Sequence, residues 1–250
     1  LAAFYTRGRG YYEQYKVDQD ITAYQMPPLL AGQDTLSQSD LIRQLWLDNH
    51  YVGGQASLNW QRKAWELTGG TGLYYYQNDH YGEVIWAEIA QDSPPGTRYY
   101  DQNADKLEYN GFFRAQYGAG KKWLLFADMQ LRGLRYRIFG FPDNPNIQVD
   151  ESFLFPNPKL GFTFNPSPKH RINAYYGIAH KEPNRVDYEN SAANLPRAEV
   201  LRDLELSYRF QSSKFQLQGG FFWMDYTDQL VLTGQVNDVG AYTRTNADRS

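Results

Sequence analysis

The sequence contains no cysteine, four histidines and no marked excess of charge of either sign. The lack of cysteine excludes a disulfide scaffold, a thiolate metal site and a cysteine nucleophile. The formal net charge of −3 does not fit a nucleic-acid-binding surface, which needs an excess of Lys and Arg. Mean hydropathy is −0.68, and no apolar run reaches the roughly 18 residues of a membrane-spanning helix, so we expect no transmembrane helix.

Signatures of enzymes are also scarce. The histidines are His50, His80, His170 and His180, and their spacing matches no zinc-binding motif. No Gly-x-Ser-x-Gly elbow occurs, and residues 118–121 lack the spacing of a phosphate-binding loop. We therefore expect no catalytic residues, no cofactor and no metal site. An outer-membrane protease or lipase that uses the neighbouring pair Asp79 and His80 is a minor alternative.

Alternation of apolar and polar residues is the dominant pattern, in a chain with 21 tyrosines. Residues 204–210 (LELSYRF) and 123–132 (WLLFADMQLR) each place apolar side chains on one face of a strand and polar ones on the other. A helix starting at Leu41 is disfavoured by the breaks at residues 48–50 and 53–54. We predict strands at 1–7, 41–60, 64–90, 106–117, 122–138, 152–164, 170–181, 199–210, 215–233 and from about Thr243. Residues 64–90 exceed one membrane crossing, so that strand projects or breaks near Gly69.

The connections between these strands alternate between short and long. Short polar turns are expected at 61–63, 118–121, 165–169 and 211–214, and long connections at 8–40, 91–105, 139–151, 182–196 and about 236–242. Strands joined in this way run up and down, with the short turns at one end. The sequence therefore predicts an all-β, antiparallel up-and-down sheet.

Three features favour a transmembrane β-barrel over a soluble β-sandwich or a lipocalin-like barrel. Charged residues such as Asp128 and Arg132 lie in the middle of strands, on the polar side. Aromatic residues such as Tyr117 and Trp123 flank the short turns, as in an interfacial girdle. The short and long connections match the asymmetry of outer-membrane barrels. Unpaired sheet edges are not tolerated in lipid, so we expect the strands to be part of a larger closed barrel or to close themselves.

Several motifs resemble TonB-dependent outer-membrane receptors. Residues 177–185 (GIAHKEPNR) followed by 199–209 (EVLRDLELSYR) resemble two neighbouring barrel strands of that family, and 221–231 (FFWMDYTDQLV) resembles the next. Residues 10–15, 46–49 and 79–86 are similar to the Bacteroidetes-type members. Ala198 and Ser207 depart from the Pro and Gly that are usual at these places. The resemblance implies that residues 1–250 are part of a barrel of about 22 strands, without the plug domain and the closing strands.

The resemblance also implies a function and a set of site residues. We expect uptake of a scarce nutrient (a ferric siderophore, haem, cobalamin or a glycan) energised through TonB, with membrane lipid, the plug and the nutrient as partners and no nucleic acid. Side chains expected to face the lumen and the plug are Asp128, Gln130, Arg132, Asp203, Glu205, Arg209, Gln216 and Gln218. Residues expected at the outer loops and the ligand are Tyr11, Tyr12, Tyr15, Tyr24, Tyr99, Tyr100, His180, Glu182 and Arg185. A wall that is merely hydrated, a structural corner at 180–185, a passive porin and a soluble β-sandwich binding module are the alternatives.

Leu1 opens the chain without a Met or a leader, and Ser250 lies just inside the last predicted strand. We therefore expect a segment of a longer protein. The resemblance to TonB-dependent receptors implies that this protein lies in the outer membrane of a Gram-negative bacterium.

Overall fold

The computed structural model describes residues 1–31, 34–89, 94–141, 145–189, 195–236 and 242–250. Ten strands form one sheet: β1 (Ala2–Asp20), β4 (Gln38–Arg62), β5 (Trp65–Ala87), β6 (Thr97–Ala119), β7 (Trp123–Phe139), β8 (Gln148–Ser167), β9 (His170–Lys181), β10 (Glu199–Gln211), β11 (Gln216–Val236) and β12 (Tyr242–Arg249). Strands β2 (Leu29–Ala31) and β3 (Asp34–Leu36) form a separate hairpin. The helical segments are η1 (Ile21–Tyr24) and α1 (Arg185–Glu189).

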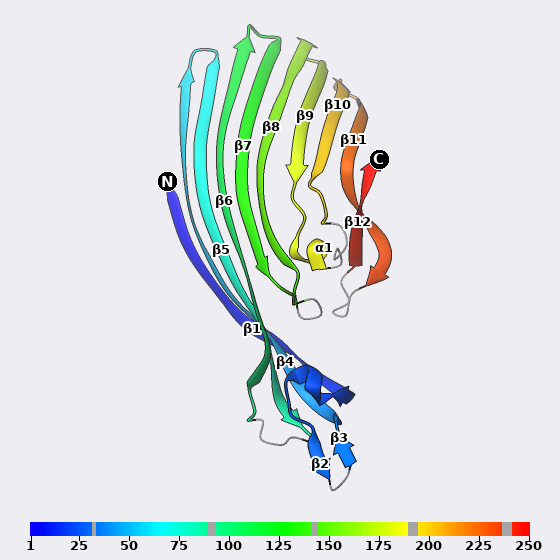
Figure 1. The fold of residues 1–250 in the computed structure, drawn as a ribbon. Coiled ribbons are helices and arrows are strands. Elements are labelled where there is room, and N and C mark those ends of the chain that lie inside the picture. The colour runs from blue at the N-terminus through cyan, green and yellow to red at the C-terminus, as the bar shows by residue number, and fades with distance from the viewer. Residues whose placement is uncertain (32–33, 90–93, 142–144, 190–194, 237–241) are drawn as a thin grey trace.

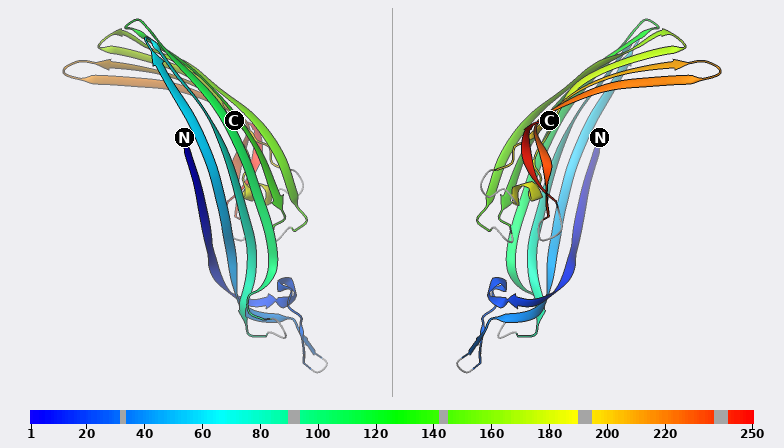
Figure 2. Two further views of the ribbon diagram at one scale, coloured as in Figure 1. Left: turned by 90° about the vertical axis from the view of Figure 1, so that its left-hand side faces the viewer. Right: turned by 90° about the vertical axis from the view of Figure 1, so that its right-hand side faces the viewer.

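Each strand of the large sheet pairs with its neighbours in chain order, and every pairing is antiparallel. Figure 1 shows the consequence: four short turns gather at one end of the sheet, called here the turn end, and the longer connections lie toward the other, the loop end. The views in Figure 2 show that the sheet is strongly curved and that the β10–β11 hairpin leans away at the turn end. The predicted all-β up-and-down architecture is confirmed. The predicted connection at 236–242 lies largely outside the described residues.

Two predicted strand boundaries differ from the structure by nine residues or more, and one predicted loop contains a helix. Strand β1 continues to Asp20 rather than ending at Arg7, because its backbone stays paired with β4 from Ala2 opposite Gln55 to Lys16 opposite Leu41. Strand β6 begins at Thr97 rather than Lys106, so Tyr99 and Tyr100 also belong to a strand. The predicted loop at 182–196 contains a short helix.

Strand β5 does not break at Gly69 and Gly70. The ring of Phe112 on β6 lies over Gly70, where a Cβ atom would come within 2.6 Å of the ring. This glycine therefore admits an aromatic ring against the backbone and leaves the pairing intact. Strand β5 is continuous and extends toward the loop end. Of the two predicted alternatives, a strand that projects and a strand that breaks near Gly69, the first is correct.

The pairing gives each face of the sheet one character. Asp128 on β7 lies opposite Arg114 on β6 and Lys159 on β8, and these three side chains define the polar face. Leu125 lies opposite Tyr117 and Phe162, and these define the apolar face. Many large, exposed apolar side chains lie on the apolar face, including Leu58, Leu73, Tyr109, Phe113, Leu131, Leu154, Leu160, Leu206 and Phe221. A sheet of this kind exposes its apolar face to a nonpolar medium rather than to water.

The apolar face has two visible limits along the strands. At the turn end, Trp123 packs on Phe164 with ring centroids 4.1 Å apart, and Trp65 packs on Tyr117 at 4.5 Å. Toward the loop end, the ion pair of Arg135 with Asp150 occupies the same face. The apolar stretch of β7 from Trp123 to Gly133 rises about 3.3 Å per residue and, tilted by about 40°, covers ~25 Å. This is the height of the apolar band of an outer-membrane barrel.

Two small hydrophobic clusters anchor the connections at the loop end. Tyr188 of α1 is fully buried against Ala104, Ile138 and Val149 of the polar face. A second cluster combines Ile21, Tyr24 and Met26 with Leu41 and Val84. No helix in the described part of the chain is long and apolar enough to span a membrane.

Candidate ligand-binding surface at the loop end

An ion-pair network joins strands β6 and β7 to the connection after β9 on the polar face. Arg132 of β7 donates to both carboxylate oxygens of Glu108 on β6, at 2.9 and 2.7 Å. The same guanidinium donates to Glu182 at 2.6 and 2.8 Å. The ammonium group of Lys106 also donates to Glu182. Both oxygens of Glu182 are thus occupied, so this residue holds the connection to the sheet.

The charge of Glu182 is stabilised by its partners. Burial alone would raise the pKa of this carboxyl group. The hydrogen bonds from Arg132 and Lys106 outweigh that effect and hold the pKa at about 2. Glu182 is therefore ionised across the physiological range, with 10% of its side chain exposed.

The connection turns sharply after Glu182. The backbone N–H of Asn184 donates to Asp187, and the N–H of Asp187 donates to the side chain of Asn184, at 2.8 and 3.1 Å. This reciprocal pair begins α1 and sets the direction of Arg185 at its first position.

Arg185 is largely buried on the polar side of the corner. Its Nη2 atom donates to the carbonyl of Gly140 at 3.1 Å, and its guanidinium lies 4.6 Å from the ring centroid of Phe141. Burial lowers the pKa of Arg185, while the phenol of Tyr136, the carboxylate of Glu189 and the phenol of Tyr100 act in the opposite direction. The buried Nη1 atom has no hydrogen-bond partner among the described residues. A guanidinium remains charged in proteins, so this nitrogen is a buried charged donor whose hydrogen bond is not made by any described residue.

Tyrosines gather near this corner on the same side of the sheet. The rings of Tyr24 and Tyr99 lie 4.7 Å apart, and those of Tyr99 and Tyr100 lie 5.0 Å apart. Tyr12 lies on the same face of β1 as Gln14, two residues further along the strand. The side chain of Gln14 accepts a hydrogen bond from Arg43, whose guanidinium also donates to the hydroxyl of Tyr24, so Tyr12 is on the polar face. Together Tyr12, Tyr24, Tyr99, Tyr100 and Arg185 form what we call the tyrosine–arginine surface.

The other expected ligand residues are placed differently. Tyr11 lies on the opposite face, packed on Trp46 with ring centroids 4.5 Å apart, and Tyr15 hydrogen-bonds Asp40. The expectation that Tyr11, Tyr12 and Tyr15 lie in a loop was wrong, because all three belong to β1. His180 stacks on Phe155 at 5.2 Å and makes a 2.9 Å contact with Asn157. His180 and Glu182 thus support the corner next to the tyrosine–arginine surface.

The eight residues expected to face the lumen share the polar face. The pairing carries this face from Asp128 across Lys159 and Gly177 to Asp203, and alternation then places Gln130, Arg132, Glu205 and Arg209 on it. The same argument places Gln216 and Gln218 there. Asp128 receives a 2.8 Å hydrogen bond from Arg114, and Gln130 one of 3.2 Å from Asn157. Their contact with a plug stays a prediction.

Sequence reasoning missed part of this wall. Lys106 and Glu108 complete the network of Arg132, but their partners are 24 to 76 residues away in the chain. Phe222 and Met224 also lie on the polar face, opposite Glu205 and Asp203, and both are exposed. The run of aromatic residues at 221–223 conceals their alternation.

The described residues place the one catalytic pair that the sequence offered on opposite faces of a strand. Asp79 and His80 are consecutive residues of β5, so their side chains point to opposite faces of the sheet and cannot form a dyad. No group of three or more potential metal ligands occurs among the described residues.

Comparisons with known proteins agree with this geometry. Residues 2–250 match the family model described as TonB dependent receptor-like, beta-barrel. Among solved structures, the copper transporter OprC is 13% identical with a TM-score of 0.72, covering 99% of this chain and 38% of its own. The ferric citrate transporter FecA is 13% identical with a TM-score of 0.54, covering 96% and 34%. The ferripyoverdine receptor of Pseudomonas aeruginosa is 12% identical with a TM-score of 0.52, covering 98% and 34%.

The search of curated proteins found no match. The chain spans about a third of the length of the solved structures it resembles.

Proposed function

The chain belongs to the TonB-dependent receptor β-barrel family, and from this premise we propose that it forms part of the wall of a receptor that takes up a scarce nutrient with energy supplied through TonB. The family lies in the outer membrane of Gram-negative bacteria, with the short turns toward the periplasm and the loop end outward. The soluble β-sandwich alternative is therefore wrong. The outer-membrane protease or lipase is wrong too, because the family consists of transporters and because Asp79 and His80 point to opposite faces of β5. The Bacteroidetes-type lineage stays a prediction.

The observation that carries the proposal is the free Nη1 donor of Arg185 beside the tyrosines at the loop end. A buried cationic donor without a partner favours a ligand that presents anionic or carbonyl oxygens. Phenol rings next to it supply flat surfaces and further hydrogen-bonding groups. An oxygen-rich metal chelate, such as a ferric siderophore or ferric citrate, presents such oxygens around the metal, whereas haem presents them only at its propionates and cobalamin at its amide side chains and phosphate.

Below this surface, the charged polar face supports contact with a plug. Along one row, Arg114, Asp128 and Lys159 alternate in sign on neighbouring strands. Such a wall offers hydrogen-bonding groups of both signs to a globular domain inside the barrel. Exposed Phe222 and Met224 add apolar area to the same face. In a water-filled porin this apolar area would be in contact with water, whereas a plug domain would cover it.

The test measures binding to the purified receptor by quenching of tryptophan fluorescence, with ferric citrate, a ferric catecholate, haemin and cyanocobalamin as probes. We expect one of the two iron chelates to bind, and Arg185→Gln to weaken that binding at least tenfold, because a charged hydrogen bond is lost. Arg171→Gln, on the polar face at the turn end, is the matched control.

Uptake of the bound probe then separates a receptor from a porin. Uptake that stops when TonB is deleted supports the proposal. Uptake that continues at the same rate without TonB, or an Arg185→Gln variant with wild-type affinity, contradicts it.

A further inference from the structure

Unpaired cations are concentrated at the turn end. Every short turn of the sheet carries a lysine: Lys63 between β4 and β5, Lys121 and Lys122 between β6 and β7, Lys169 between β8 and β9, and Lys214 between β10 and β11. Within the described part of the chain, none of these five has a carboxylate within 4 Å. By contrast, Lys106 and Lys181 at the loop end both make ion pairs. The turn lysines are thus free to meet an external anion.

These lysines border the aromatic rim of the apolar face. Trp60 and Trp65 flank the turn with Lys63, and both indoles are about half exposed. Trp123 directly follows Lys122, and Phe215 directly follows Lys214. Amphipathic aromatic rings occupy the boundary between acyl chains and headgroups. The ammonium groups therefore lie at the level of lipid phosphates, on the water side of that boundary.

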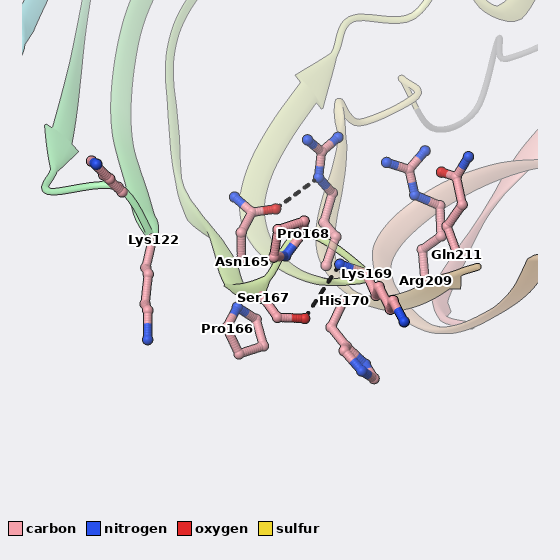
Figure 3. A pocket seen from close by; sticks show the side chains of 11 residues that line it. Lys122, Asn165, Pro166, Ser167, Pro168, Lys169, His170, Arg209 and Gln211 are labelled. Carbon is pink, nitrogen blue, oxygen red and sulfur yellow. Dashed lines mark hydrogen bonds between the residues drawn. The ribbon is translucent and has the colours of Figure 1, made fainter. Parts of the chain in front are cut away.

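A hollow of about 430 Å³ lies between two of the turns, as Figure 3 shows. Its cationic lining consists of Lys121, Lys122, Lys169, Arg171 and Arg209, and no carboxylate lines it. Arg171 donates to Asn165 at 3.1 Å, and Ser167 accepts from the backbone N–H of Lys169 at 3.3 Å. These bonds fix the β8–β9 turn. Because Arg171 and Arg209 belong to the polar face, the hollow adds positive charge to the turn end but is not the site of a lipid whose chains lie on the apolar face, and that role falls to the lysines along the rim.

We propose that the turn end binds the phosphate headgroups of anionic lipids in the membrane leaflet that surrounds it. The cations extend over four successive turns and follow the rim of the apolar face, a distribution that matches lipids with their chains against that face better than one dissolved anion. Each lysine near an anionic lipid surface contributes roughly a fivefold gain in binding. The proposal depends on the membrane position of the barrel and is independent of the nutrient at the loop end.

The experiment measures lipid binding to the receptor in neutral detergent by native mass spectrometry. The lipid probes are phosphatidylglycerol, which is anionic, and phosphatidylcholine, which carries a phosphate but no net charge. The test variant replaces all five turn lysines by Gln (Lys63→Gln, Lys121→Gln, Lys122→Gln, Lys169→Gln and Lys214→Gln). Its matched control replaces the same five by Arg. Heat-modifiable mobility on gels identifies the folded fraction of each variant, and only that fraction is compared.

We expect the wild-type receptor to bind phosphatidylglycerol more tightly than phosphatidylcholine, with an affinity that falls as salt rises. If one lipid contacts two lysines, the Gln variant weakens phosphatidylglycerol binding roughly 25-fold, and the Arg variant retains it. Equal binding by the Gln variant and the wild type overturns the proposal. So does equal affinity for both lipids, or displacement of phosphatidylglycerol by inorganic phosphate at matched concentration, which would indicate a site for a soluble anion.

Discussion

Replacing Glu182 by Gln should loosen the corner that presents Arg185. The carboxylate accepts hydrogen bonds from Arg132 on both oxygens and from Lys106 on one of them. The amide keeps one accepting oxygen, turns an NH₂ group toward a guanidinium nitrogen that is also a donor, and carries no charge. A pKa of about 2, against an ordinary value of 4.5, corresponds to ~3 kcal/mol of stabilisation of the ionised form. Because Lys106 keeps 26% of its side chain exposed and can hydrate, we expect a loss of ~2–3 kcal/mol.

Hydrogen–deuterium exchange of the folded receptor in detergent measures this loss where it occurs. Amides of Asp187 and Tyr188, which donate to the carbonyl of Asn184, should exchange roughly 30- to 150-fold faster in the variant. Glu205→Gln is the matched control, since Glu205 lies on the same face and makes no ion pair within the described residues. Equal exchange in the two variants would refute the argument that Glu182 holds the corner.

The same measurement has a defined pH dependence. A depressed carboxyl pKa contributes stability that is complete above about pH 4.5 and is lost as the pH falls toward 2. Protection of the corner in the wild type should therefore decrease across that interval, and the decrease should be absent from the Glu182→Gln variant. A similar decrease in both proteins would assign the effect to other carboxylates.

Two further predictions concern the sheet itself. Gly161→Val should lower the free energy of unfolding by ~1–3 kcal/mol, because a Cβ atom there meets the carbonyl of Ala174 at 2.5 Å. The folded fraction is measured by heat-modifiable mobility. Gly219→Val, where a Cβ atom has open space, should have little effect. Leu206→Lys places a charge on the apolar face and should make the free energy of insertion into lipid vesicles less favourable by up to ~2–4 kcal/mol. Glu205→Lys, on the polar face, should insert like the wild type. Wild-type folding of Gly161→Val, or equal insertion of the two lysine variants, would count against the assigned packing and faces.

The architecture could be predicted because most strands show the same alternation of apolar and polar residues. Alternation along residues 123–132 and 204–210 identifies strands and their apolar side, and tight turns fix their order. The long connections carry no such periodicity. Strand β1 beyond Arg7 contains tyrosines and charges on both faces, because it extends past the apolar band, where neither face needs to be apolar.

The candidate site was predictable only in part. The corner at 180–185 has a recognisable local sequence, and Arg185 was identified from it. The free donor of Arg185 depends on Gly140 and Phe141, which lie more than 40 residues away. Long-range pairing of this kind, like the bond between Lys106 and Glu182, leaves no signal in a single sequence.

The assignment of the two faces is the central claim, and site-directed spin labelling tests it most directly. The described chain has no cysteine, so Met129→Cys and Gln130→Cys each provide one label in this segment, on adjacent residues of β7 that point to opposite faces. For the receptor in lipid vesicles, the account predicts that the label at 129 collides with oxygen dissolved in the bilayer and is shielded from a water-soluble nickel reagent, and that the label at 130 is shielded from lipid. Lipid exposure at 130 together with shielding at 129 would contradict it.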